Sequence, residues 1–389
     1  MKKLQAFGLA LLLFLCTATG LHVLAGRRLE FNDPKFNAWV NDEKLLYSRA
    51  ICENLGPNTI PVFGSSEFRH GRSTPYHAAK VLSGQPFQLM LIGAGYYQSL
   101  FHATALAAIG PAMEQDQAVL ILSPQWFKPS GVLPEVYTSR FSEYNFVQML
   151  KNDKLSQQTK EYIIQRTKQL LEPDPAMGER VELYERVLVT KDASLWDKLH
   201  YKAWTTFLEE KMTVGLLLKA KAAGIRHDAP QPTPRPAPDW AALETQADAD
   251  GAKANTTNQF GMNDDFYFLY KNTMLKSKKD SMKQADYTQS PEYGDLICFL
   301  NVCRDLGIRP LLVSLPVNGP WYDYMGFPQQ NRQAYYQKIR DIAAEYGAEL
   351  ADLSTEEYTP HFFEDNTHIA WKGWVKLNES LYRFAAPAA

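Results

Sequence analysis

Short apolar runs alternate along the chain with segments of helical periodicity. Each run is rich in Val, Ile, Leu and Phe and ends close to a Gly, Ser or Asp. The predicted strands are residues 59–63, 87–92, 118–122, 309–315 and 349–353. The predicted helices around them are residues 74–83, 97–109, 291–306, 328–346 and 370–384. Near-continuous apolar strands that alternate with helices are typical of a parallel sheet covered on both faces. The pattern therefore predicts a three-layer α/β/α fold with a five-stranded, mainly parallel sheet.

The α/β rhythm is interrupted in the middle of the chain. Residues 141–223 are dominated by Lys, Glu, Gln and Leu at helical spacing. Residues 228–258 are poor in large apolar side chains, and every second position from 230 to 238 is a proline. This composition favours an extended surface linker. We expect one α/β domain, formed by residues 29–140 and 290–389, with a helical insertion at 141–289 that contains the Pro-rich linker.

The N-terminus carries the longest apolar stretch of the sequence. A run from Leu4 to Ala25 lies between Lys2-Lys3 and Arg27-Arg28. About 20 residues of this kind are enough to span a bilayer as a helix, whereas a cleaved signal peptide has a shorter apolar core. We interpret residues 1–28 as an uncleaved membrane anchor. The basic residues on its two sides balance, so the charge rule does not decide its orientation.

Composition and charge exclude several classes of protein. The formal net charge of the 389-residue chain is −2, which gives no electrostatic basis for nucleic-acid binding. The four cysteines have no CxxC spacing, so neither a zinc site nor a disulfide framework is predicted. Three histidines, at 70, 77 and 361, also lack the spacing of a metal site. We expect no metal and no cofactor.

Residues with useful chemistry follow several of the predicted strands. The first three strands end at Gly64-Ser65-Ser66, Gly93-Ala94-Gly95 and Ser123-Pro124-Gln125, and Asp365 and His368 stand in the loop after the fifth. Because ligands bind at the carboxyl ends of the strands in an open parallel sheet, we expect these groups to meet at one edge. A hydroxyl, an imidazole, a carboxylate and backbone N–H groups are the components of nucleophilic acyl transfer.

Each component also has a simpler explanation. Ser65 or Ser66 is suited to cap a helix N-terminus, and an Asp-x-x-His pair such as Asp365 and His368 occurs by chance in many chains. Their combination in this order favours catalysis over these separate structural roles.

The first and last of these motifs resemble the corresponding blocks of the SGNH (GDSL-like) hydrolases. The resemblance implies a flavodoxin-like three-layer domain in which Ser66 is the nucleophile, with Ser65 as the alternative. It gives His368 the role of the base and Asp365 that of the residue that orients it.

Longer motifs resemble the DltD family, whose members are membrane-anchored proteins of lipoteichoic acid D-alanylation. The motifs are residues 61–68, 123–127 and 364–374, within a resemblance that covers most of 1–225 and 290–389. The family implies an extracytoplasmic domain on a single-pass anchor, with lipoteichoic acid as acceptor. It also implies two partners, a membrane-bound O-acyltransferase of the DltB type and a D-alanyl carrier protein of the DltC type.

The resemblance also suggests where an oxyanion would be stabilised. The donors would be the backbone of Ser66, Gly93 or Gly95, and the loop of Gln125. Typical SGNH enzymes place an Asn in that last loop, so its replacement by Pro124-Gln125 puts the side-chain donor in doubt.

Charged residues near these motifs suggest substrate contacts. Glu67 is placed to meet the ammonium of a D-alanyl ester, although a Glu in a first helical turn also complements the helix dipole. The lysines between 271 and 283 are candidates for contact with teichoic phosphates, although a solvated helix face is their default explanation.

Three functions remain open from the sequence. The first is a D-alanyl transferase that acts through a seryl ester on Ser66. The second is a surface esterase or thioesterase that uses the same triad and passes the acyl group to water. The third is a non-catalytic scaffold that binds the carrier protein or the teichoic chain.

Overall fold

The computed structural model describes residues 2–25 and 29–386. The strands are β1 Thr59–Phe63, β2 Gln88–Ile92, β3 Gln117–Leu122, β4 Arg309–Ser314 and β5 Glu349–Asp352. The α-helices are α1 Lys2–Ala25, α2 Pro34–Ala38, α3 Asp42–Leu45, α4 Ser48–Cys52, α5 Ala78–Val81, α6 Ser99–Ile109, α7 Pro134–Arg140, α8 Glu143–Lys151, α9 Gln157–Leu170, α10 Pro175–Glu185, α11 Leu195–Ala222, α12 Trp240–Ala254, α13 Asp264–Thr273, α14 Leu275–Lys278, α15 Glu292–Leu306, α16 Gly319–Tyr324, α17 Gln329–Glu345 and α18 Trp371–Ala385. Short 3₁₀ turns are η1 Ser66–Phe68, η2 Gly110–Ala112, η3 Pro124–Phe127 and η5 Ser354–Glu356, and Arg186–Thr190 is a π-helical turn.

The five strands form one parallel sheet in the order β2-β1-β3-β4-β5, as the apolar pattern predicted. The chain passes from β1 to β2 on one side and then returns across β1 to β3 on the other. The strand order therefore reverses at β1. In open α/β sheets the crevice at such a reversal is the usual place for a ligand, so the carboxyl end of β1 is where a site is expected.

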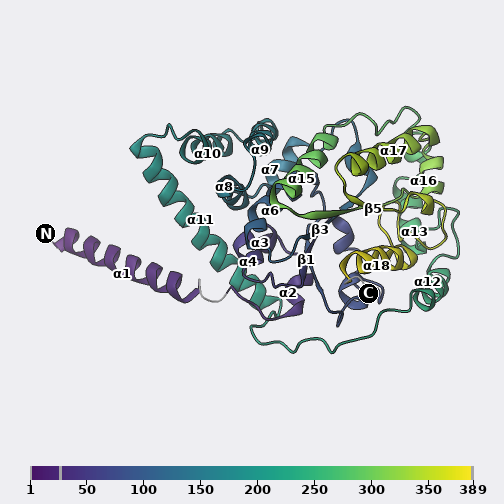
Figure 1. Cartoon of the computed structure of the whole chain (residues 1–389), viewed down its shortest axis with the longest axis horizontal. Helices are drawn as coiled ribbons and strands as arrows, with labels where there is room; N and C mark the ends of the chain where they lie inside the picture. The colour runs from purple at the N-terminus through teal and green to yellow at the C-terminus, as the bar shows by residue number, and fades with distance from the viewer. Residues whose placement is uncertain (1, 26–28, 387–389) are drawn as a thin grey trace.

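Helices cover both faces of the sheet, which confirms the α/β/α layering. Helices α15 and α17 lie above the strands in Figure 1, and α18 lies below them. Helix α6 packs against α15, and α5 packs against α18. The inner face of α18 is an apolar stripe at helical spacing, formed by Trp374, Leu377, Leu381 and Phe384, all buried. The predicted helix 74–83 is shorter than expected, because α5 begins only at Ala78.

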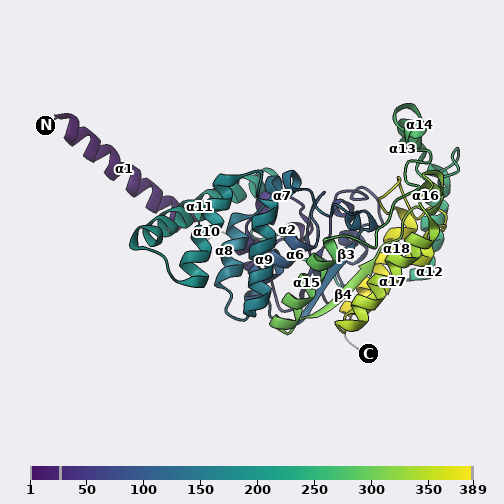
Figure 2. The ribbon, with the colours of Figure 1, turned by 90° about the horizontal axis from the view of Figure 1, so that it is seen from above.

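The insertion between β3 and β4 packs directly on the α/β domain. Helix α8 contacts α6, α9 contacts α15, and α10 and α11 extend this group outward. Figure 2 shows these helices side by side at one end of the molecule, with α12 and α13 at the opposite end. The two halves of the insertion thus lie on opposite sides of the sheet.

The predicted extended linker 228–258 is only partly extended. Residues 240–254 form α12, which packs against α18, so that part of the prediction is wrong. Trp240, Leu243 and Ala247 follow one another at helical spacing, and the Asp239 side chain caps the helix by accepting the N–H of Ala242. The low apolar content concealed this pattern, because the contact face consists largely of small residues.

Within the part of the chain whose residues are described, no helix combines the length and the hydropathy needed to cross a bilayer. Helix α1 extends away from the body near α11 in both views (Figures 1 and 2). Arg27 and Arg28, which flank the predicted anchor, lie outside the described residues.

A buried lysine closes the open edge of the sheet at β2. The Nζ of Lys44 donates to the carbonyl of Leu91 in β2 at 3.0 Å, and to those of Phe36, Asn37 and Trp39 at 2.9, 2.9 and 3.2 Å. Burial lowers the pKa of Lys44, because desolvation penalises the ammonium. One side chain therefore links carbonyl groups of α2 to a carbonyl group of the edge strand and gives each of them a buried donor.

We predict that Lys44→Met lowers the free energy of unfolding by about 3 kcal/mol, because the buried carbonyls lose their donor. The measurement is urea denaturation of the two proteins. The matched control is Lys35→Met, since the exposed Lys35 Nζ makes one bond, to the Ala223 carbonyl, and its loss should change stability by less than about 0.5 kcal/mol. A Lys44→Met protein as stable as the unsubstituted chain would contradict this role.

Candidate active site

The turn after β1 presents Ser66 at the carboxyl edge of the sheet. Ser65 occupies the cap position of η1, with φ −126° and ψ −128°, and Ser66 is the first residue of that turn. The Ser65 hydroxyl is buried and donates to the Ala94 carbonyl at 3.1 Å. Both serines line a cavity, but the Ser66 hydroxyl is the one that lies within hydrogen-bond distance of an imidazole, that of His368. Of the two serines considered from the sequence, Ser66 is thus the one placed to react.

His368 lies within hydrogen-bond distance of Ser66, although 302 residues separate them. The His368 Nε2 is 2.8 Å from the Ser66 Oγ, and its Nδ1 is 2.7 Å from the Asp365 Oδ2. A carboxylate only accepts, so Nδ1 carries the ring proton and Nε2 is left to accept the Ser66 hydroxyl. The three side chains that the sequence assigns to catalysis therefore form one hydrogen-bonded series.

The Asp365 carboxylate is held in its ionised form. It is buried, and desolvation alone would raise its pKa, but hydrogen bonds from the His368 ring and from the N–H groups of Thr367 and His368 lower the pKa below the usual value. An anionic Asp365 fixes the tautomer of His368 and stabilises the imidazolium that forms when His368 takes a proton.

Neighbouring segments hold the loop that carries Asp365 and His368. The Asn263 N–H, just before α13, donates to the Glu364 carbonyl at 2.9 Å, and Tyr270 of α13 donates to the Asn366 side chain at 2.8 Å. An isolated bridge between Phe363 and Ile369 closes the loop. The second half of the insertion therefore supports the imidazole that faces Ser66.

Glu67 points beneath the site. Its Oε1 accepts the Ser65 N–H at 2.5 Å, and only 3% of the residue is exposed. Burial raises its pKa, against the opposing effect of hydrogen bonds and the two nearby imidazoles. Glu67 does not line the cavity around Ser66, so the structure gives it a supporting place under the turn, and contact with a D-alanyl ammonium stays a prediction.

The glycines after β2 lie at two different depths. Gly93 has φ +149°, and a Cβ on it would meet the Gly64 carbonyl oxygen at 1.8 Å. Gly95 lies nearer the surface, lines the cavity, and would place a Cβ 3.8 Å from the Cβ of Ser66. Gly93 thus allows close packing of the two turns, while Gly95 lies beside Ser66 at the cavity.

The cavity at Ser66 has a volume of about 650 Å³, within the range of small-molecule sites. Gln125 lines it, and its side chain has no hydrogen-bond partner among residues 2–25 and 29–386. Further lining residues that the sequence analysis did not assign to the site are Arg69, His70, Tyr96, Gln98 and Lys128, of which it had considered His70 only as a metal ligand. Arg69 and His70 follow Ser66 by three and four residues, which is the one sequence signal that could have placed them.

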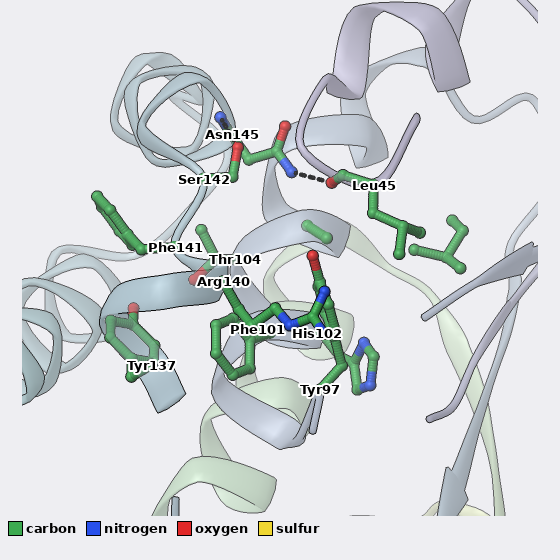
Figure 3. A pocket seen from close by; sticks show the side chains of 12 residues that line it. Leu45, Tyr97, Phe101, His102, Thr104, Tyr137, Arg140, Phe141, Ser142 and Asn145 are labelled. Carbon is green, nitrogen blue, oxygen red and sulfur yellow. Dashed lines mark hydrogen bonds between the residues drawn. The ribbon is translucent and has the colours of Figure 1, made fainter. Parts of the chain in front are cut away.

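A second cavity, shown in Figure 3, lies behind the loop that follows β2. Its volume of about 20 Å³ has room for a water molecule and none for a substrate. His102 lines it and packs against Phe63 and Trp126. Burial lowers the pKa of His102 to about 3, so this histidine is neutral. It supports β1 and η3 from below.

His70 adds a second histidine–carboxylate pair to the site. The ligand-type atoms of His70, Glu364, Asp365 and His368 all lie within 4.8 Å of one another. The Nδ1 of each imidazole is already bonded to a carboxylate, that of His70 to Glu364 and that of His368 to Asp365. The arrangement suits proton transfer, and the expected absence of a metal stays a prediction.

Comparisons with known proteins place this geometry in context. The model of the family described as DltD protein matches residues 33–386. Protein DltD of Bacillus subtilis (strain 168) is 30% identical over 336 residues, covering 84% of this chain and 82% of that protein. Protein DltD of Staphylococcus aureus is 27% identical over 82% of this chain and 79% of that protein. Protein DltD of Lacticaseibacillus rhamnosus is 25% identical over 85% of this chain and 78% of that protein.

We predict that Gly93→Ala disrupts the turn of Ser66, because the added Cβ collides with the Gly64 carbonyl and the residue has a positive φ. Labelling of Ser66 by a fluorophosphonate reagent should fall by at least about tenfold, the equivalent of 1.4 kcal/mol. Gly95→Ala is the matched control and should keep most of the labelling, since its Cβ has space. Equal labelling of the two variants would contradict the prediction.

Proposed function

The chain belongs to the DltD family, and on that premise we propose that it is a membrane-anchored extracytoplasmic acyltransferase. It moves D-alanyl groups onto lipoteichoic acid through a seryl ester on Ser66. The observation that supports this proposal most directly is the series Ser66–His368–Asp365, with distances of 2.8 and 2.7 Å at the wall of a 650 Å³ cavity.

In the first step the Ser66 Oγ attacks the carbonyl carbon of an activated D-alanyl donor. The hydroxyl proton passes to the His368 Nε2, and Asp365 stabilises the resulting imidazolium. When the tetrahedral intermediate collapses, the bond to the leaving group breaks and the leaving group takes the proton from His368. Ser66 is left as a D-alanyl ester.

In the second step an acceptor hydroxyl of lipoteichoic acid attacks the ester on Ser66. His368 takes the proton of that hydroxyl and returns it to the Ser66 Oγ as the acyl–serine bond breaks. Water in place of the acceptor would give hydrolysis by the same steps, so the alternative esterase differs only in which nucleophile reaches the cavity.

Both intermediates carry negative charge on the former carbonyl oxygen. The N–H groups of Ser66 and Gly95 are placed to donate to it, and neither has an acceptor within the described part of the chain. The Gln125 side-chain amide, which also lines the cavity, is the third candidate donor. Donors arranged in advance are usually the largest contribution to such catalysis.

Basic side chains at the cavity rim suit an acceptor that carries phosphate groups. Arg69 and Lys128 line the cavity and are exposed. Partial desolvation and the charge of Lys278, on α14, lower the pKa of Lys128, so Lys278 lies close to the same rim. Of the lysines 271–283 considered from the sequence, Lys278 is the one that this proximity favours as a phosphate contact.

Membrane attachment and partners complete the proposal. The apolar run from Leu4 to Ala25 is the proposed anchor. A membrane-bound O-acyltransferase of the DltB type would export the D-alanyl group, and a carrier protein of the DltC type would supply it. The proposal places the α/β domain outside the membrane, where lipoteichoic acid is found.

We predict that Ser66→Ala abolishes D-alanyl transfer, with a loss of at least about 10³-fold. The measurement is the D-alanyl ester content of lipoteichoic acid in cells that express the variant at unchanged level. Ser65→Ala is the control and should retain transfer within about tenfold, because the Ser65 hydroxyl bonds only the Ala94 carbonyl. D-alanyl esters at the unsubstituted level with Ser66→Ala would overturn the mechanism.

We also predict that Lys128→Met and Lys278→Met each reduce transfer to lipoteichoic acid by about two- to fivefold, as expected for exposed ion pairs. The loss should shrink at high salt because exposed charges are screened. Hydrolysis of a small uncharged ester should stay unchanged. Lys202→Met, an exposed lysine of α11, is the control. A loss that is the same for both substrates would remove the phosphate contact from the proposal.

A further inference from the structure

A second imidazole lies face to face with the proposed base. The His70 and His368 rings are stacked with centroids 3.5 Å apart and planes within 5° of parallel. The His70 Nδ1 is 2.5 Å from the Glu364 Oε1, just as the His368 Nδ1 is 2.7 Å from the Asp365 Oδ2. Two adjacent acids of one loop therefore hold two parallel imidazoles, and only one of these faces Ser66.

Both members of the second pair are tied to the catalytic groups. His70 belongs to the turn of the nucleophile, and its N–H donates to the Ser66 carbonyl at 3.0 Å. The Glu364 N–H donates to the His368 carbonyl at 2.9 Å. The His70–Glu364 hydrogen bond thus connects the segment of Ser66 with the segment of His368, next to the hydrogen bond along which the proton would move.

We propose that His70 is a positioning residue, which holds the ring plane of His368 and carries a proton of its own so that His368 remains neutral and able to act as a base at mildly acidic pH. This inference rests on the proposed function, because it takes His368 as the base of the acyl transfer.

The charged groups around the two rings support a protonated His70 beside a neutral His368. The turn of Ser66 contributes Glu67 and Arg69, the loop contributes Glu364 and Asp365, and α13 contributes Tyr270. Lys128 lines the same cavity as His70 and His368. The hydrogen bond to Glu364 raises the pKa of His70, against desolvation and with help from Asp365 and Glu67. Burial raises the pKa of Glu67 itself. Glu364 and Asp365 are the two carboxylates that are hydrogen-bonded to the imidazoles.

Stacking makes the protonation of the two rings interdependent. An imidazolium over the face of a neutral imidazole is a favourable arrangement, whereas two stacked imidazoliums repel each other. A proton on His70 therefore opposes a second proton on His368 in the free protein. During acylation His368 does gain the Ser66 proton, and each of the two cations then has its own carboxylate.

The test is an NMR pH titration of the histidine Cε1–H resonances of the full chain, with His368→Gln used to assign the His368 signal. In His70→Phe, which keeps a flat ring but loses the charge, the His368 midpoint should move up by about one pH unit. His70→Gln should give the same upward shift and serves if the Phe variant does not fold. Glu364→Gln should move the midpoint of His70 itself downward.

The matched control is His361→Asn. His361 forms a similar pair with Asp248 at 2.9 Å but does not touch His368, and Asn tolerates the positive φ of 60° at this position. It should leave the His368 midpoint unchanged. An unchanged or lowered midpoint in both His70 variants overturns the inference.

A second readout separates charge from ring orientation. The measurement is the pH profile of the rate at which a fluorophosphonate labels Ser66. In His70→Phe the fall of this rate on the acidic side should lie about one pH unit higher. His70→Ala should show the same shift and also a several-fold lower maximal rate, because the ring stack is lost. A lower maximal rate without the shift would mean a structural role only and overturn the proton-holding role. Neither measurement uses a D-alanyl donor or acceptor. If the chain does not transfer D-alanyl groups, the inference about His70 can still hold, and if the inference about His70 fails, the proposed transfer can still hold.

Discussion

The hydrogen bond between Ser66 and His368 is the contact on which the proposed acyl transfer depends. It joins residues 302 positions apart at a distance of 2.8 Å. A serine hydroxyl is a weak nucleophile until a base takes its proton, so a displacement of the His368 loop of about 1 Å would weaken the site. Much of the surrounding structure can be understood as what keeps these two segments at that distance.

Three kinds of support meet at this contact. The strand order brings the two segments to one edge, because β1 lies where the order reverses and the final loop follows β5. The Gly93–Gly64 contact sets the height of the nucleophile turn. The loop of His368 is fastened by Asn263 and Tyr270, which belong to the insertion. The insertion is thus part of the architecture of the site, although it carries none of the three reacting side chains.

Buried and half-buried polar groups hold the surrounding segments in position. Glu67 holds the backbone of Ser65, His70 and Glu364 link the two sides of the site, and Lys44 closes the edge of the sheet beside β2. Each such group would be costly to bury alone and is hydrogen-bonded instead. These bonds are directional, so they specify positions that apolar packing would leave free.

The sequence by itself determined the five strands, the α/β/α layers and the serine, aspartate and histidine of the site, because these follow from local periodicity and from the rule that ligands bind at the carboxyl edge. It misjudged α12, where only Trp240 and Leu243 are large apolar residues and the buried positions are Ala247 and Gly251. Only the tertiary structure decided which serine hydroxyl meets His368, and only it revealed the stack of His70 on His368. The physical reason is that burial and ring contact depend on side-chain direction and on segments nearly 300 residues apart. Neither leaves a periodic signal in the chain.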